Sequence, residues 1–594
     1  MAVNYKAPIN DIIFTYDVLD SYNILNKIEK FKDFGLDTLE PIVEECAKFA
    51  EEVLAPINSI GDKNGAIFDE GIVKMPPGFK EAYEKFTKAG WSSISLPSDI
   101  GGGGLPYGLS AAILEILCTA NMAFVLGPGL SIGAISGINF HANQGQKDMY
   151  LPDLVAGNWT GTMNLSEPQS GSDLSNISTK ATKQDDGTYR ITGTKIWIGS
   201  GEHDLSENII HLVLAKVPGS PEGTKGISMF IVPKFVVNDD SSLGGHNKVN
   251  CISIEEKLGI HGSPTCVMEY DGSVGYLIGE ENMGLNYMFT TINEARIRAG
   301  GHGLACTSGA LQGASQYARD RVQGRPVGMT KEEAKDSSII DHADVRRTLM
   351  TIKSYLDAMR YMNYDNHLML DLEYFAEGEL KDFGKERCGI LTPITKAWIS
   401  DLSVELTSMA IQVYGGMGYV EETGIAQYFR DARIAPIYAG TNGIQAEDLV
   451  FRKITLNDGK AVESLLKEMR TNISSMKEHE NLEPLSEILE RHVAEIEEAT
   501  QYLLKELGKG NLAGVSASGT PYLKMFGQVL GGHYMGKAAV TATKNLLEDN
   551  TEFYNNKFTL SKFYIKQLLP LASSYFSSVM LGKENLYSID SNSF

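Results

Sequence analysis

Residues 412–450 read QVYGGMGYVEETGIAQYFRDARIAPIYAGTNGIQAEDLV, a stretch that closes one helix, forms a glycine-containing turn and opens another. Before it, apolar residues recur at three- and four-residue spacing, which predicts a helix ending at Gly415 and Gly416. The next helix is expected to begin after Gly443, and the turn between them holds residues 438–442. Glycines in front of a helix let backbone N–H groups approach an anionic or carbonyl-bearing ligand. A plain helix–loop–helix with a glycine cap explains the same residues.

The length and composition of the chain predict a soluble protein of several domains. Its 594 residues exceed what one core supports, so three or four domains are expected. Hydrophobic residues make up 43% of the chain and charged residues 22%, as in globular proteins. The net charge of −22 and the pI near 5.0 argue against nucleic acid and anionic membranes as partners, because both bind basic surfaces.

The N-terminus and the cysteines predict a cytoplasmic protein. The first residues, MAVNYKAPINDIIFTYDVLD, have neither the basic start and apolar core of a secretory signal nor the Arg-rich character of a transit peptide. No apolar run is expected to approach the roughly 20 residues of a membrane span. The six cysteines are scattered without a Cys-x-x-Cys pair, which indicates reduced, buried thiols. The eleven histidines show no ligand-type spacing with them, so no metal site is expected.

Changes in periodicity divide the chain into five segments. A mixed pattern over 1–35 predicts an N-terminal arm, and an apolar stripe of helical period predicts a helical domain over 36–158. β-type runs fill 159–284 and are spaced as in an antiparallel barrel or sandwich rather than as βαβ units. Helical patterns return over 285–455, with lengths that suit a four-helix bundle, and over the more charged 456–594. Together these segments predict an α+β fold.

Within the bundle segment, helices are expected at 285–321, 338–370, 392–414 and from about 443. The GGGGLPYG stretch from Gly101 has neither G-x-G-x-x-G spacing nor a following Gly-Lys-Ser/Thr, so it predicts a mobile turn between helices rather than a nucleotide-binding loop.

The 412–450 stretch resembles the C-terminal signature of the acyl-CoA dehydrogenase family. The family's Gln, Gly-Gly pair, Arg-Asp-Ala and Tyr-Glu-Gly-Thr fall here on Gln412, Gly415, Gly416, 430–432 and 438–441. The order helical domain, β domain, helical bundle is also that of the family, and the likeness covers nearly all of 36–455. The arm and the tail resemble a longer subfamily, which includes the 3-methylmercaptopropionyl-CoA dehydrogenases.

A first segment of the β domain resembles the family's flavin segment. MNLSEPQSGSDLSN, from Met163, matches a strand and loop that lie along the isoalloxazine ring and its ribityl chain. The resemblance implies that Met163, Leu165 and Ser166 contact FAD and that Ser172 lies near its phosphate or the CoA ester. Local composition alone is also that of a Ser-rich turn between strands.

A second segment, TGTKIWIGSG, resembles a family segment whose Trp packs on the flavin. The resemblance places Trp197 there, although a Trp in a strand is also an ordinary core residue. Gly199 stands where the family has Thr or Ser, so one hydroxyl contact to the cofactor is expected to be missing or to come from Ser200.

The first bundle helix carries two further matches. Arg296, in Asn-Glu-Ala-Arg, aligns with an Arg that supports the bound acyl-CoA, while a surface charge pair with Glu294 explains it equally well. Arg321 and Gln323 align with residues that reach FAD bound in a neighbouring subunit, and a planar guanidinium suits a pyrophosphate. The resemblance therefore implies a homodimer or homotetramer.

The turn and the helix end before it complete the implied site. Cofactor contacts are expected from Gln412, Gly415, Gly416, Thr441 and Gly443. Tyr438 and Gly440 are expected to line the substrate, with Arg296 and Ser172.

The Glu of the family's Tyr-Glu-Gly-Thr is the usual catalytic base, and here that position is Ala439. The α-hydrogen of a thioester leaves only if preformed donors stabilise the developing enolate oxygen in a pocket that excludes water. In the family these donors are a ribityl hydroxyl and the backbone N–H of the residue at position 439. Ala439 keeps that N–H and lacks the carboxylate, and loss of a general base typically costs about 10² to 10⁴-fold in rate.

Three explanations of Ala439 are open. An engineered substitution that traps a substrate complex ranks first. A relocated base ranks second: some members carry it just before the Arg, which is Ala295 here, and Glu294 is one residue away, about 100° around the helix. A natural member without dehydrogenase activity is the third.

The resemblance implies FAD-dependent α,β-dehydrogenation of an acyl-CoA to the 2-enoyl-CoA. A short acyl chain such as 3-methylmercaptopropionyl, as in dimethylsulfoniopropionate catabolism, and electron-transferring flavoprotein as the acceptor are expected. An acyl-CoA oxidase and a non-catalytic, flavin-bearing member of the fold are the alternatives.

Overall fold

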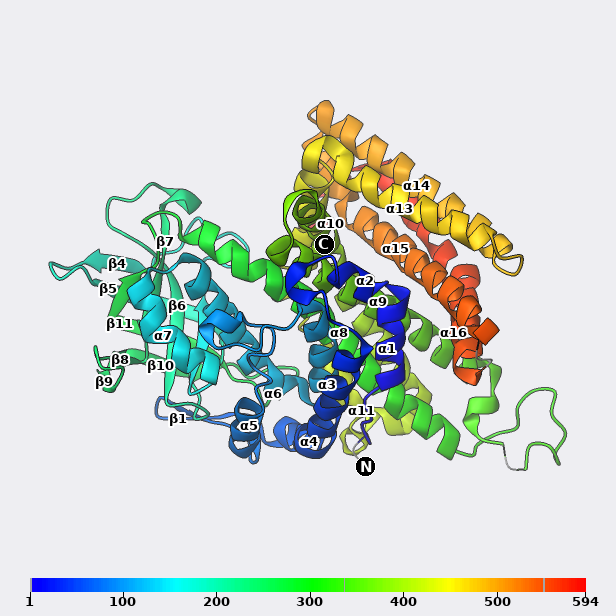
Figure 1. Cartoon of the computed structure of the whole chain (residues 1–594), viewed down its shortest axis with the longest axis horizontal. Helices are drawn as coiled ribbons and strands as arrows, with labels where there is room; N and C mark the ends of the chain where they lie inside the picture. The colour runs from blue at the N-terminus through cyan, green and yellow to red at the C-terminus, as the bar shows by residue number, and fades with distance from the viewer. Residues whose placement is uncertain (1–2, 336, 549–550) are drawn as a thin grey trace. The chain divides into compact units, whose positions relative to one another are not determined.

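A computed structural model describes residues 3–335, 337–548 and 551–594. It confirms the predicted fold class: helices precede and follow a middle β-sheet, and further helices close the chain (Figure 1). Tertiary contacts divide the chain into two compact units. We call Cys46–Leu105 with Ile116–Ala295 the β unit, and Met1–Glu45, Pro106–Glu115 and Arg296–Phe594 the helical unit. This division differs from the five predicted segments.

The β unit is built around a seven-stranded sheet. Its strands are β3 (Trp159–Asn164), β4 (Lys180–Lys183), β5 (Tyr189–Gly199), β6 (Asn208–Lys216), β7 (Ile227–Pro233), β10 (Val249–Ile254) and β11 (Thr265–Leu277). The order is β10-β11-β5-β4-β6-β3, and β7 pairs with both β6 and β11, so the pairing closes into a ring as expected of a barrel. Most pairs are antiparallel, whereas β3 and β4 each pair with β6 in parallel.

Smaller elements of the β unit surround this sheet. Two short strands, β1 (Ile67–Asp69) and β2 (Ile72–Lys74), pair with each other, as do β8 (Phe235–Val237) and β9 (Leu243–His246). The helices are α4 (Ala55–Asn64), α5 (Phe79–Lys88) and α7 (Gln144–Ala156), and α3 (Leu36–Phe49) crosses from the helical unit. Apolar side chains of α7 pack into one core with the inward side chains of β6 and β7.

The glycine run at 101–104 forms a compact turn after the short helix Ser98–Ile100. The N–H groups of Gly102 and Gly103 donate to backbone oxygens of Pro97 and Ser93 at 3.0 and 2.9 Å. A side chain on Gly102 would place its Cβ 2.2 Å from a backbone oxygen of Leu96. Close approach of two backbones therefore explains these glycines.

Helix α6 (Tyr107–His141) corrects the expectation that no apolar run approaches the length of a membrane span. It contains an 18-residue window of mean hydropathy 1.9, and 83% of that window is buried. Packing as a core helix therefore accounts for its composition. The helix is broken at Asn121, which has φ −162° and ψ 87° and accepts a hydrogen bond from the Phe124 N–H at 3.1 Å, as an N-cap does.

Three long helices form the centre of the helical unit: α8 (Gly284–Asp320, from Arg296 on), α9 (Ala343–Phe375) and α10 (Gly378–Tyr414). The predicted start of α10 at Thr392 is wrong by about four turns, because Pro393 is accommodated inside the helix. Two short helices, α11 (Ile425–Ala432) and α12 (Asn442–Asp448), follow.

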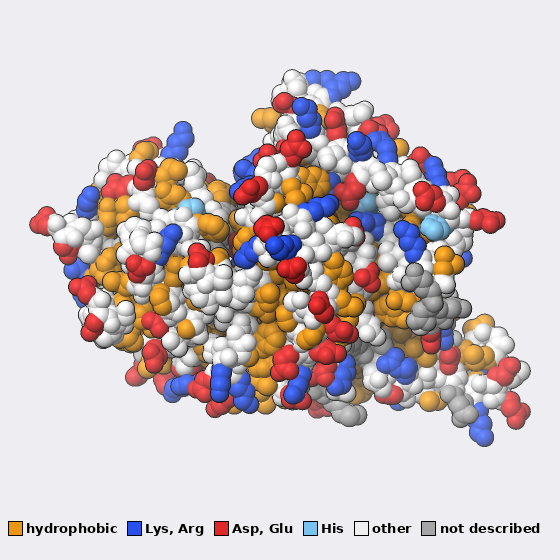
Figure 2. Space-filling view, in the orientation of Figure 1, with side chains coloured by type: hydrophobic (Ala, Val, Ile, Leu, Met, Phe, Trp, Pro, Cys, Tyr) orange, Lys and Arg blue, Asp and Glu red, His pale blue; other side chains and the backbone are white. Residues whose placement is uncertain are grey.

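Further helices from both ends of the chain complete this unit. They are α1 (Ile9–Val18), α2 (Ser21–Leu25), α13 (Lys460–Lys477), α14 (Glu483–Gly508), α15 (Leu512–Glu548), α16 (Glu552–Phe563) and α17 (Ala572–Leu581). Helix α15, labelled in Figure 1, packs against α14, α16 and α17 and also against α9, α10 and α12. Acidic and basic side chains are interspersed over the outer helices in the face that Figure 2 displays.

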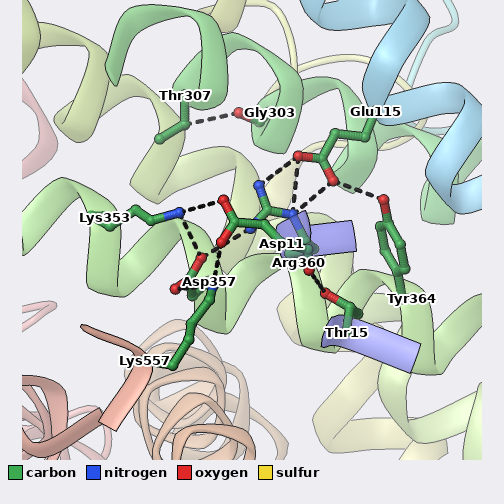
Figure 3. A network of polar contacts seen from close by, with 10 residues as sticks. All are labelled: Asp11, Thr15, Glu115, Gly303, Thr307, Lys353, Asp357, Arg360, Tyr364 and Lys557. Carbon is green, nitrogen blue, oxygen red and sulfur yellow. Dashed lines mark hydrogen bonds and ion pairs between the residues drawn. The ribbon is translucent and has the colours of Figure 1, made fainter. Parts of the chain in front are cut away.

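A buried network of charges joins four of these helices (Figure 3). The Arg360 guanidinium on α9 donates to both carboxylate oxygens of Glu115, on the first turns of α6, at 2.7 to 3.1 Å. It also donates to Asp357 at 2.9 Å, and Lys557 of α16 donates to the other oxygen of Asp357 at 2.8 Å. Lys353 donates to Asp11 of α1 at 2.7 Å. The three cations and three anions balance.

Breaking this network at its centre is expected to destabilise the helical unit. Arg360→Met leaves Glu115 buried without its bidentate partner, so we expect a loss of about 3–5 kcal/mol. The shift of the urea unfolding midpoint measures it. Arg346→Met, on the same helix, is the control, because Arg346 is 62% exposed and its pair with Asp341 is worth at most about 1 kcal/mol. Equal losses in the two variants would contradict the assigned role of the network.

Candidate functional site

The predicted flavin segment is held in place by a buried ion pair. Glu167, in the loop after β3, contacts the Lys195 ammonium of β5 at 2.8 Å, and both side chains are fully buried. The same ammonium donates to the backbone oxygen of Leu165 at 2.9 Å, and the Ile196 N–H donates to that of Ser166 at 3.0 Å. These hydrogen bonds therefore hold the start of the loop, at Leu165 and Ser166, against β5.

The far end of this loop is bound to the same carboxylate. One oxygen of Glu167 accepts from the backbone N–H and hydroxyl of Ser178 at 2.6 and 2.7 Å, and the other from those of Thr179 at 3.1 and 2.6 Å. Burial alone raises the pKa of Glu167, but Lys195 and these hydrogen bonds outweigh it and bring the pKa to about 2. Burial lowers the pKa of Lys195 to about 8, so the pair is ionised near pH 7.

Trp197 has a conformation that needs an explanation. It lies in a β-bulge, where the pairing of β5 with β11 shifts register between Cys266 and Met268. Its φ is +62°, a left-handed value that is an outlier for a bulky side chain, and its side chain is 61% exposed. Backbone strain of this kind persists only where the surrounding structure enforces it. Such residues are concentrated at functional sites. The bulge directs the indole out of the sheet core.

The other predicted residues of the β unit lie beside this feature. Met163 is the next-to-last residue of β3 and is half-buried, and Gly199 ends β5, where its backbone oxygen accepts from the Thr162 hydroxyl of β3 at 2.8 Å. Ser172 lies exposed at the tip of the Glu167 loop. The structure thus brings Met163, Leu165, Ser166, Trp197 and Gly199 to one pair of strand ends and places Ser172 on the adjoining loop.

The ion pair predicts a specific acid sensitivity. Glu167→Gln leaves Lys195 buried without a carboxylate and is expected to cost about 3–5 kcal/mol at pH 7. Because the folded pKa of Glu167 lies below that of an unfolded Glu, about 4.3, its stabilisation is present above pH about 4.3 and is lost as the pH falls toward 2. Urea midpoints from pH 7 to pH 3 should fall steeply for the unaltered chain and less steeply for the variant.

Glu269→Gln is the control, because Glu269 lies exposed on β11 of the same unit. It should leave both the midpoint at neutral pH and its acid dependence unchanged. If Glu167→Gln behaves as Glu269→Gln does, the ion pair does not hold the loop.

In the helical unit, side chains of two helices, α8 and α10, form hydrogen bonds with the turn at 438–442. The Tyr438 hydroxyl and Nδ1 of His302 on α8 form a hydrogen bond. Burial, with Arg298 nearby, lowers the pKa of His302 to about 3, so the ring is neutral and can accept. On the other side, the Asn442 amide donates to Asp401 of α10 at 2.6 Å. The Asn442 N–H also donates to the Pro436 backbone at 3.1 Å and closes the turn.

Ala439 occupies a left-handed backbone conformation within this turn. Its φ is +54° and that of Gly440 is +83°. A non-glycine residue in this region costs of order 1–2 kcal/mol, and Ala has no polar side chain to offset that cost by local hydrogen bonding. The hydrogen bonds of Tyr438 with His302 and of Asn442 with Asp401 hold the turn at both ends, although the side chain at 439 is only a methyl group.

Arg296 and Glu294 project to different sides of α8. The Arg296 guanidinium contacts Asp448 of α12 at 3.5 Å, and a Cβ placed on Gly440 would lie 3.9 Å from its Nη2. Glu294 is two residues away, about 200° around the helix, and accepts a hydrogen bond from Ser136 of α6 at 3.5 Å. Arg296 therefore borders the turn within the helical unit.

The remaining predicted residues of this unit are accessible. Gln412, Gly415 and Gly416 lie exposed at the end of α10, where Gly415 has φ +58° and terminates the helix. Arg321 and Gln323 lie exposed just after α8.

Thr441 is the N-cap of α12, and its hydroxyl accepts from the Ile444 N–H at 3.4 Å, while Gly443 is exposed on that helix. The hydroxyl proton of Thr441 stays available to a ligand.

Sequence reasoning did not identify the side chains that hold these features. Glu167 and Lys195 stand inside the two quoted motifs, in Ser-Glu-Pro and Gly-Thr-Lys, but their pairing depends on the register of the sheet. His302, Asp401 and Asn442 come from three separate helices. A polar residue on a helix face that is otherwise apolar was the one signal for His302, and core packing explains such a residue as readily.

Comparison with known proteins identifies the class. Residues 37–158, 162–273 and 282–453 match the N-terminal, middle and C-terminal domains of acyl-CoA dehydrogenases, and residues 465–590 match a segment described as acetyl-CoA dehydrogenase C-terminal like. The chain therefore belongs to the acyl-CoA dehydrogenase family. The family and the enzyme class predicted from sequence are confirmed.

Individual relatives match over nearly the whole chain. 3-Methylmercaptopropionyl-CoA dehydrogenase of Ruegeria pomeroyi is 39% identical over 97% of this chain and 98% of its own length. Butyryl-CoA dehydrogenase of Syntrophomonas wolfei is 32% identical over 96% and 95%. A crystal structure of an acyl-CoA dehydrogenase from Bacillus anthracis, complexed with FAD, superposes with a TM-score of 0.73 at 20% identity over 94% of this chain and 91% of that one. At that identity the last match shows the fold.

Proposed function

We propose that this chain binds FAD and a short acyl-CoA, and that it retains the turn that holds the thioester carbonyl while lacking the group that removes the α-proton. One observation carries the proposal. The Tyr438–Asn442 turn keeps a strained conformation, tethered to α8 and α10, although its central side chain is a methyl group. A turn that served only to connect two helices would have no need of an alanine at positive φ.

The residues present fit FAD. The exposed indole of Trp197 offers an aromatic face to a flat ring, and Met163 and Leu165 offer apolar contact beside it. A Cβ added to Gly415 or Gly416 would meet no atom within 4 Å, so a ligand can approach that backbone closely. When bound, FAD supplies the acceptor for the β-hydrogen, which leaves the acyl chain as a hydride.

The chain's own residues then perform two tasks. The Ala439 N–H donates to the thioester oxygen and stabilises negative charge that develops there, because it is held in place before the reaction. Arg296, buried beside Gly440, orients the acyl-CoA. A methyl group at 439 cannot accept the α-proton, so dehydrogenation is slowed by about 10² to 10⁴-fold. Whether the alanine is engineered or natural does not alter this expectation.

The finer assignments rest on the relatives and on the residues that align with the family. The relative of known substrate with 39% identity supports 3-methylmercaptopropionyl-CoA, a step of dimethylsulfoniopropionate catabolism, and the butyryl-CoA relative supports a short chain in general. Exposed Arg321 and Gln323 support a homodimer or homotetramer in which they reach the cofactor of a neighbour. Electron-transferring flavoprotein as the acceptor and a cytoplasmic location complete the proposal.

Restoring the carboxylate tests the function. Under anaerobic conditions, Ala439→Glu should bleach the flavin absorbance near 450 nm on addition of butyryl-CoA or 3-methylmercaptopropionyl-CoA, at least about 10²-fold faster than the unaltered chain. Ala439→Gln is the matched control, since it has nearly the same size and hydrogen-bonding groups but no basic carboxylate. It should stay as slow as the alanine form.

Other outcomes separate the alternatives. Equal bleaching by the alanine and glutamate forms would place the base elsewhere. Bleaching by neither form, with both acyl-CoAs bound, would favour a non-catalytic flavin-bearing protein. Rapid oxygen consumption by the glutamate form would identify an oxidase.

A further inference from the structure

A buried lysine lies behind the turn and is used by nothing described so far. Lys396 of α10 is fully buried, and its ammonium donates to Oδ1 of Asn442 at 2.7 Å. The amide nitrogen of the same Asn442 donates to Asp401 at 2.6 Å and to the Ser400 hydroxyl at 3.0 Å. Both ends of the Asn442 amide are therefore bound to one face of α10.

A buried ammonium of this kind is costly for the fold. Removing a charge from water costs several kcal/mol, and a single amide oxygen offsets little of it. Burial accordingly lowers the pKa of Lys396 to about 7, an effect that Asp401 opposes and Arg296 reinforces. Costly, perturbed groups next to a candidate site are themselves candidates for a role in function.

The connection from Lys396 to Ala439 is short. Asn442 follows Ala439 by three residues, and its own N–H closes the turn onto Pro436. On the other side of Ala439, the Tyr438 hydroxyl is fixed to His302. Gly440 between them is free of side-chain restraint at φ +83°, so the orientation of the Ala439 peptide depends on where Asn442 is held.

We propose that Lys396 is a positioning residue that, through Asn442, sets the direction of the Ala439 N–H and thereby the strength with which the chain binds a thioester carbonyl. The inference rests on the proposed function, because it assigns this N–H to the carbonyl oxygen. If Lys396 acts in this way, its loss weakens the binding of only those ligands that have a carbonyl. If Lys396 merely stabilised the fold, its loss would affect ligands with and without a carbonyl alike.

Two matched ligands test the proposal on the full chain loaded with FAD. Butyryl-CoA has the thioester carbonyl, and S-butyl-CoA is the thioether without it. In Lys396→Met the dissociation constant of butyryl-CoA should rise about tenfold, the value expected when one well-aligned hydrogen bond is lost, while that of S-butyl-CoA changes by less than about twofold. Calorimetry measures both constants.

A spectroscopic readout accompanies the titrations. The infrared C=O stretch of bound, ¹³C-labelled butyryl-CoA reports the strength of the hydrogen bond to the carbonyl. In Lys396→Met it should move toward the frequency of the free ligand.

Lys524→Met is the control variant. Lys524 of α15 also approaches Asp401, at 3.9 Å, but it is about one-third exposed and does not contact Asn442. Its removal should leave both dissociation constants and the carbonyl frequency unchanged, which separates loss of a cation near Asp401 from loss of the tether.

Several results would overturn the inference. An unchanged ratio of the two dissociation constants in Lys396→Met, whether both stay constant or both rise together, would show that Lys396 does not act on the carbonyl. If neither ligand binds to the unaltered, FAD-loaded chain, the proposed function itself fails. Should Lys396→Met not retain FAD, Asn442→Leu removes the same tether from the other side, and the same ratio decides.

Discussion

The buried Arg360–Glu115 pair is the interaction on which the helical unit depends. A guanidinium and a carboxylate, each almost fully buried, are stable only if their hydrogen bonds are nearly all satisfied. Here Glu115 accepts from Arg360 and from the Tyr364 hydroxyl, and Arg360 extends the network through Asp357 to Lys557. The geometry is therefore demanding, and it fixes α6, α9 and α16 relative to one another within this unit (Figure 3).

The same network explains how the ends of the chain become part of the enzyme's core. Asp11 belongs to the N-terminal arm and Lys557 to the last helical segment, and both contribute to the charge balance around α9. An arm or tail attached only by surface contacts would be removable at little cost. Because each supplies a counter-charge to a buried group, loss of either leaves an uncompensated charge, which ties the additional helices to the stability of the bundle.

At the candidate site, too, buried polar contacts hold backbone segments in place. The flavin segment is fixed by Glu167 and Lys195, and the 438–442 turn is fixed by His302 and Lys396, all of them buried or half-buried polar groups behind the surface that a ligand would contact. The left-handed residues Trp197 and Ala439 lie close in sequence to these contacts, two residues after Lys195 and one residue after Tyr438. Glu167 and Lys195 stand inside the two segments that resemble the family, whereas His302 and Lys396 lie outside every segment of that resemblance.

What the sequence determined by itself was the class of secondary structure along the chain, the family, and the alanine that stands at position 439, where the family signature has a glutamate. Hydrophobic periodicity reports helix or strand because it repeats over many residues, and the 412–450 signature is local, so Ala439 could be recognised without coordinates. The start of α10 was predicted about four turns too late, and the folded helix contains Pro393, because tertiary packing around a helix can override the local cost of a proline.

Only the tertiary structure decided which polar residues meet. Glu115 and Arg360 are 245 positions apart, and Lys396 and Asn442 are 46 apart, so no local pattern relates them. Their contacts follow from how helices pack and from the register of the sheet, which the periodicity of one segment does not contain. For the same reason, the left-handed conformation of Ala439 became known from the folded chain alone.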